Sequence, residues 1–64
     1  MKLNGKTVEI KSGETLLSLL ESLGHKPARV AAELNGSIIP REKFATTFLC
    51  DDDTLEVVCF VGGG

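Results

Sequence analysis

The sequence ends in three consecutive glycines, Gly62, Gly63 and Gly64, which follow the apolar pair Phe60 and Val61. Glycine adds no side chain to a core and loses the most conformational entropy on ordering, so a glycine run after a strand-like segment indicates that the end itself is used. Without Cβ atoms, such a tail can enter a narrow channel and bring its terminal carboxylate to the reactive centre of another protein. Ordinary fraying of a terminus explains the tail equally well. The tail alone therefore leaves two interpretations, a carrier that works through its C-terminus or an idle end.

The remaining reactive side chains are not spaced for metal or redox chemistry. Cys50 and Cys59 form neither a Cys-x-x-Cys pair nor a zinc pattern, and we expect both to be reduced and at least half-buried. His25 has no second ligand at ligand spacing and receives no role. Asp51–Asp53 lacks the alternating acids and the glycine of a calcium loop and is typical of a surface turn. We expect no metal site and no catalytic residue.

Length and composition limit what the chain can do. Sixty-four residues form one small domain with an aliphatic core, since tryptophan and tyrosine are absent. Such a core has no room for a substrate cavity of ~300–1,000 Å³, which argues against an enzyme. The net charge of −2, without basic runs, argues against nucleic-acid binding. The sequence shows neither an apolar stretch of ~20 residues nor an export leader, so we expect a cytoplasmic protein with no membrane partner.

The first half of the chain predicts a β-hairpin and a helix. The Asn4-Gly5 pair tolerates the positive φ of a type I′ turn and joins strands at residues 1–3 and 7–10. Thr15 is placed to cap a helix that ends at Gly24, shortly before Pro27. Leucines at i, i+3, i+4 and i+7 give this helix one apolar stripe. The stripe consists of Leu16, Leu19, Leu20 and Leu23.

The second half predicts three further strands. Residues 30–34 and 37–39 form a second hairpin around an Asn-Gly pair, and Pro40 ends it because proline cannot donate to a sheet ladder. Residues 41–47 are polar and predict an irregular segment with a short helical turn. Residues 55–60 alternate as the final strand. The residues that we expect beneath the leucine stripe are Leu3, Val8, Ile10, Leu55 and Val57.

One helix over one sheet face predicts an α+β domain. The helix connects the second strand to the third, a crossover that places strands in parallel within an otherwise antiparallel sheet. The expected fold is the β-grasp of ubiquitin-like proteins, with a mixed four- to five-stranded sheet packed on one main helix. Residues 1–61 form this domain, and residues 62–64 are expected to be a flexible tail.

The final strand also predicts a docking surface. If Leu55 and Val57 face the helix, alternation turns Val58 and Phe60 to the open face of the sheet. Together with Val61, they are candidates for docking a partner, because exposed apolar patches often mark such sites. In the alternative, a bulge lets Phe60 cap the edge of the core.

Four segments give the chain a family resemblance over essentially its whole length. They are Ser12-Gly13-Glu14-Thr15-Leu16, Val30-Ala31-Ala32-Glu33-Leu34-Asn35-Gly36, Ile39-Pro40-Arg41-Glu42 and Phe60-Val61-Gly62-Gly63-Gly64. With these, the chain resembles the ThiS sulfur carriers of thiamine biosynthesis. It departs from them at the middle of Asp51–Asp53, where the family often has glycine, so the geometry of that turn is in question. Arg41, Glu42 and Lys43 lie either in a docking contact or in a structural loop, and we favour an Arg41 that binds carbonyl groups.

The resemblance implies that the protein is a substrate of other enzymes and holds no cofactor. In the family, a ThiF-like adenylating enzyme uses ATP to activate the terminal glycine, here Gly64. A sulfur donor then displaces AMP, and a ThiG-like thiazole synthase takes sulfur from the resulting thiocarboxylate. Gly62 and Gly63 would supply the narrow approach. Two alternatives stay open: a molybdopterin-synthase small subunit, which shares fold and Gly-Gly end, and a β-grasp interaction module with an idle tail.

Overall fold

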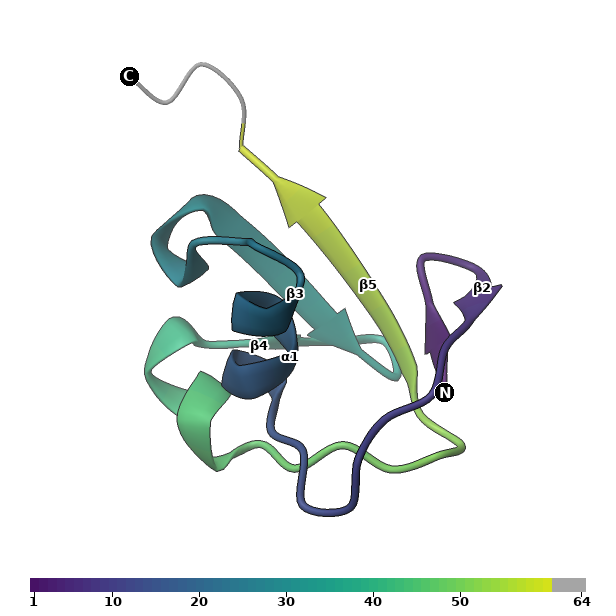
Figure 1. Cartoon of the computed structure of the whole chain (residues 1–64). Helices are drawn as coiled ribbons and strands as arrows, with labels where there is room; N and C mark the ends of the chain where they lie inside the picture. Colours follow the sequence, from purple (N-terminus) through teal and green to yellow (C-terminus); the bar gives the residue numbers. More distant parts are fainter. Residues whose placement is uncertain (61–64) are drawn as a thin grey trace.

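The computed structural model describes residues 1–60 (Figure 1). Five strands, one α-helix and two 3-10 helices follow one another along the chain. They are β1 (Lys2–Leu3), β2 (Lys6–Thr7), α1 (Leu16–Ser22), η1 (Pro27–Arg29), β3 (Val30–Leu34), β4 (Ser37–Ile39), η2 (Arg41–Thr46) and β5 (Thr54–Cys59). No helix in this part of the chain is long and apolar enough to span a membrane.

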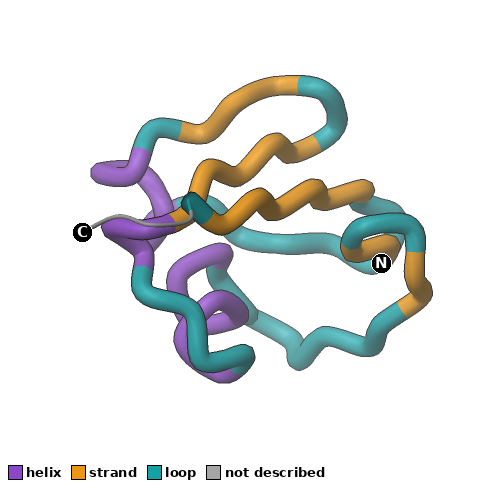
Figure 2. The backbone as a smooth tube through the Cα atoms, turned by 90° about the horizontal axis from the view of Figure 1, so that it is seen from above, coloured by secondary structure: helices purple, strands orange, loops and turns teal. Residues whose placement is uncertain are grey.

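The strands form one mixed sheet in the order β2-β1-β5-β3-β4 (Figure 2). β1 and β5 are parallel neighbours, and the other neighbouring pairs are antiparallel. The prediction of a mixed sheet on one main helix is therefore confirmed. The crossover through α1 connects β2 to β3, which run in the same direction but are separated by β1 and β5. The adjacent parallel pair is thus formed by the first and last strands.

Both Asn-Gly pairs form the predicted turns, and their asparagines also bind β5 and the turn before it. Asn4 and Asn35 have φ values of 51° and 52°, the left-handed conformation that these turns require. The Asn4 side chain accepts a hydrogen bond from the Val57 amide at 2.8 Å and donates to the Val57 carbonyl at 3.2 Å. The Asn35 side chain accepts from the Thr54 amide at 2.9 Å and donates to Asp53 Oδ1 at 2.9 Å. Each turn is therefore linked to the last part of the chain, which carries the candidate site.

The ends of α1 follow from local sequence. Ser18 N donates to Thr15 Oγ1 at 3.1 Å, and Thr15 N donates to Ser18 Oγ at 2.9 Å, a reciprocal capping box. At the other end Gly24 adopts a φ of 82°, and His25 N donates to the Leu20 carbonyl at 2.9 Å. This is the 6→1 bond of a Schellman motif, which stops the helix and fixes the backbone of His25.

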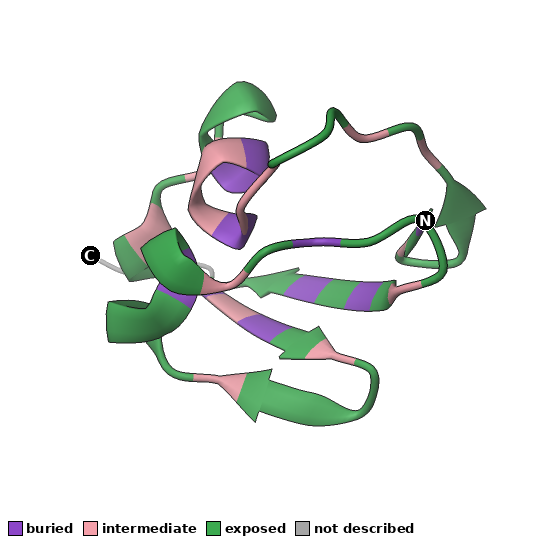
Figure 3. Ribbon diagram, turned by 90° about the horizontal axis from the view of Figure 1, so that it is seen from below, coloured by how far each residue is buried: buried purple, intermediate pink, exposed green. Residues whose placement is uncertain are grey.

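The predicted core is correct except at one leucine. Leu16, Leu19 and Leu20 are buried, whereas Leu23 is the C-cap residue and 47% exposed, because the helix ends one residue before it. Leu55 and Val57 are buried, and the side chains of β5 alternate between buried and exposed (Figure 3). The partly buried Leu3, Val8 and Ile10 pack against the core, although β2 ends at Thr7 and residues 8–10 lie outside the sheet. Five further residues are buried that were not predicted from the sequence: Met1, Val30, Ala32, Phe44 and Leu49.

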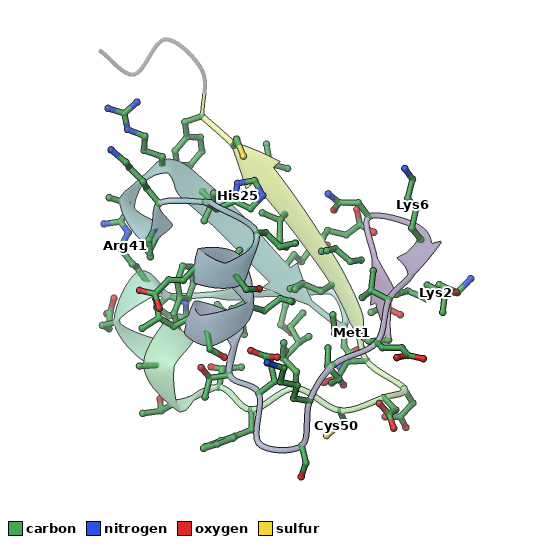
Figure 4. All side chains as sticks on the ribbon, viewed as in Figure 1. Met1, Lys2, Lys6, His25, Arg41 and Cys50 are labelled. Carbon is green, nitrogen blue, oxygen red and sulfur yellow. The ribbon has the colours of Figure 1, made fainter. Side chains whose placement is uncertain are left out.

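Two loops, one at Arg41 and one at Asp51–Asp53, have the local structure that the sequence left open. Arg41 Nε donates to the Pro27 carbonyl at 3.2 Å and Arg41 Nη2 donates to the Ala28 carbonyl at 3.5 Å, so Arg41 holds η1, as favoured from the sequence (Figure 4). In the acidic turn, Asp53 Oδ2 accepts from the Cys50 amide at 2.8 Å, and Asp53 N donates to the Cys50 carbonyl at 3.1 Å. No residue of this turn has a positive φ, so it needs no glycine.

Candidate functional site

The last described residue is firmly held beside the sheet. Cys59 pairs with Val30 at the end of the β3–β5 ladder. One residue later, Phe60 N donates to the Arg29 carbonyl at 2.8 Å. The position from which the chain continues beyond Phe60 is therefore fixed by η1 and β3. The predicted roles of Val61 and of Gly62–Gly64, and the proposed boundary at residue 61, lie outside the described residues and stay predictions.

Two of the candidate docking side chains are exposed. Val58 is 61% exposed and Phe60 53%, and Phe60 is not part of the core. The alternation of β5 is therefore as predicted, and Phe60 does not cap the core edge. A third exposed apolar residue, Ile38 of β4, is 73% exposed and was not predicted from the sequence. The Ser37-Ile38-Ile39 alternation could have indicated it, since Ile39 packs against the core and Ile38 must then face away. The docking role of these residues stays a prediction.

The expectation of buried cysteines is wrong, because Cys50 and Cys59 are both exposed. Cys50 belongs to the turn before β5. By the alternation of the strand, Cys59 belongs to the same face of β5 as the buried Leu55 and Val57. It is nevertheless exposed, because it lies at the end of β5, after the last buried position of that strand. Within residues 1–60, the Cys59 side chain has one hydrogen-bond partner, His25, whose Nδ1 lies 3.3 Å from Cys59 Sγ; Figure 4 shows where His25 lies.

The structure thus brings together Cys59 and His25, which lie 34 positions apart in the sequence and which spacing rules could not connect. The Schellman motif after α1 places the histidine there. The pair alone does not make a metal site: among residues 1–60, no three His, Cys, Asp or Glu side chains gather where they could hold an ion. The described part of the chain thus has an exposed sheet face and an end at Phe60 that is fixed by a hydrogen bond to Arg29.

This fold is a β-grasp: a mixed sheet whose first and last strands are parallel neighbours packs on one helix. The ThiS family model matches residues 1–64, and the chain belongs to the ThiS family. It is 42% identical over 65 residues to the sulfur carrier protein ThiS of Bacillus subtilis, covering 100% of this chain and 98% of that one. The crystal structure of the thiamine biosynthesis protein ThiS from Geobacter metallireducens superposes with a TM-score of 0.78 at 36% identity, covering 98% of this chain and 96% of that one.

A different type of relative is much longer. The chain is 42% identical over 62 residues to a thiazole synthase of Magnetococcus marinus. That match covers 97% of this chain but only 19% of the thiazole synthase, so the chain spans about a fifth of that relative's length.

Proposed function

We propose that this protein is a sulfur carrier of thiamine biosynthesis and that Gly64 carries the sulfur. The observation that supports this most directly is the end-to-end match to a protein named as a sulfur carrier, which includes the terminal glycines. The fold agrees with it, because β5 leads directly into residues 61–64 from a point held by the Phe60–Arg29 hydrogen bond. A tail with a fixed origin that ends in three glycines can be directed into a partner's reactive centre, which makes sulfur delivery a matter of positioning.

The chemistry requires activation by another protein. A carboxylate is a poor electrophile, so an adenylating enzyme joins the Gly64 carboxylate to AMP from ATP and releases pyrophosphate. The sulfur of a donor then attacks the carbonyl carbon, and AMP leaves. When the donor is a persulfide, a thiol must cleave the resulting acyl disulfide before the thiocarboxylate is free. On this proposal the chain is a substrate in the cytoplasm, and ATP is bound by its partner.

We also propose that thiazole synthase receives the sulfur. A segment like this chain occurs within the thiazole synthase of Magnetococcus marinus, where carrier-like and synthase parts belong to one polypeptide. Two proteins that act on one another as separate chains can also occur fused in one polypeptide, and such a fusion supports an interaction between the two separate chains. The ThiS family match favours this assignment over the molybdopterin-synthase subunit, and loading of the tail would exclude an idle-tailed interaction module.

Loading can be tested on the full chain by intact-mass spectrometry. After incubation with ATP, the adenylating enzyme of the same organism and sulfide, we expect the mass gain of one oxygen replaced by sulfur. Omitting ATP should prevent the gain, since activation precedes sulfur transfer. An unchanged mass in the presence of an enzyme shown to be active on another carrier would contradict the carrier function.

Phe60→Ala tests the predicted docking role of the end of β5. Because the Phe60 ring is half-exposed and outside the core, its loss should shift the melting temperature by only a few degrees. Affinity for the adenylating enzyme or for thiazole synthase should fall about tenfold or more if the ring enters a partner pocket. A lower melting temperature with unchanged affinity for both enzymes would instead assign Phe60 a structural role.

A further inference from the structure

The open face of the sheet carries two glutamates that face each other across neighbouring strands. Glu33 of β3 and Glu56 of β5 are direct partners in the antiparallel register, and both are exposed. Side chains at directly opposed positions have Cβ atoms about 4.5–5.5 Å apart, and like charges there are destabilising. Two carboxylates in directly opposed positions are in general a less favourable cross-strand pair than neutral residues.

Apolar side chains surround this pair. Ile38 is the partner of Glu33 on the other side, in β4, and Val58 follows two positions after Glu56 on the same face. Together with Ala31, these residues line a shallow hollow of about 330 Å³ on the exposed face. The hollow thus has an apolar lining, two carboxylates and no basic residue. Such a surface is complementary to an apolar partner surface that presents one positive charge.

The chain does not supply that charge from the adjacent strand. On β1 the register places Lys2 opposite Thr54, two residues before Glu56. Lys2 is exposed and is not among the residues that line the hollow. A second copy of this chain cannot supply it through the same face, because two such faces would bring four carboxylates together. The surface therefore fits a different protein.

We propose that Glu33 and Glu56 together bind one arginine or lysine side chain of thiazole synthase, while Ile38 and Val58 contact apolar residues around it. An arginine fits best, because its planar guanidinium can donate to two carboxylates at once. This inference rests on the proposed carrier function. Thiazole synthase is chosen as the occupant because a segment like this chain is part of the Magnetococcus thiazole synthase. Binding relieves the repulsion between the glutamates, so the pair favours the complex over the free carrier.

The test compares two double variants with equal net charge. In Glu33→Gln/Glu56→Gln we expect an unchanged or higher melting temperature and an affinity for thiazole synthase about tenfold or more below that of the parent. The control, Glu9→Gln/Glu21→Gln, removes two exposed carboxylates that lie outside the sheet and should bind like the parent. Parent affinity should decrease with added salt more steeply than that of the Glu33/Glu56 variant, because the variant has lost the charge pair.

Binding is measured by isothermal titration of thiazole synthase and, in parallel, of the adenylating enzyme. Equal losses in the two double variants would show a general charge effect and overturn the inference. An affinity loss of Glu33→Gln/Glu56→Gln for the adenylating enzyme alone, with unchanged affinity for thiazole synthase, would also overturn the inference. The loading assay separates these failures from failure of the carrier function: a chain that is loaded with sulfur but binds thiazole synthase independently of Glu33 and Glu56 remains a carrier without this contact.

Discussion

Deleting Gly64 should lower the rate of thiocarboxylate formation by about 10²-fold or more without changing the melting temperature. The deletion leaves a Gly-Gly end but shortens the reach of the tail by at most ~3.6 Å. A displacement of ~1 Å at a reacting centre can cost a factor of about 10² in rate. The melting temperature should not change, because Gly64 has no side chain that could pack in the core. The measurement is the initial rate of sulfur incorporation by intact mass, with melting followed by circular dichroism.

Two substitutions complete this experiment. Gly63→Ala keeps the length but adds a Cβ atom where a narrow channel would leave no room, so loading should also fall. Cys59→Ser is the control that removes an exposed thiol close to the tail. It should be loaded like the parent, because sulfur is attached to Gly64 and not to a side chain. Normal loading of the Gly64 deletion would remove Gly64 as the required acceptor, and loss of loading in Cys59→Ser would assign the thiol a part in the transfer.

The sequence predicted best those elements that are determined locally. The two Asn-Gly turns, the Thr15 cap and the Gly24 stop depend on backbone conformations that few residue types adopt, so a single residue is informative. The alternation of β5 then followed from the period of a strand, including the exposure of Val58. These signals were sufficient for the fold class and for the surface that leads to the tail.

What the sequence did not reveal depends on contacts between distant segments. Cys59 meets His25 only because β5 ends near the loop after α1. Likewise, Glu33 and Glu56 become a pair only through the register of β3 and β5, which are 23 residues apart along the chain at this position. Leu23 had the right spacing for the core and the wrong position relative to the helix end. Rules of residue spacing describe one helix, strand or motif at a time, so they cannot predict contacts between distant segments.

Leu20→Ala should reduce the free energy of unfolding by ~2–5 kcal/mol. Leu20 is fully buried, with 0% of its surface exposed, and belongs to the cluster that contains Leu16 and Leu55. Its truncation removes apolar burial and leaves a cavity that a rigid sheet beneath the helix can fill only in part. At roughly 0.05–0.15 kcal/mol per residue, a domain of 64 residues has about 3–10 kcal/mol of stability, so this loss removes a large share of it. We therefore expect a variant with a much lower urea midpoint than the parent.

Leu23→Ala provides the matched control, because it makes the same change one turn later, at the C-cap of α1, where the side chain is 47% exposed. Its cost should be below about 1 kcal/mol. Urea unfolding followed by far-ultraviolet circular dichroism gives both values, since the chain has no tryptophan or tyrosine for fluorescence. If Leu20→Ala does not fold, Leu20→Met conserves volume and should cost less than about 1.5 kcal/mol. Sulfur loading of each variant should follow its folded fraction, because β5 places the tail and the core holds β5. Equal losses for Leu20→Ala and Leu23→Ala would contradict the burial on which this core is built.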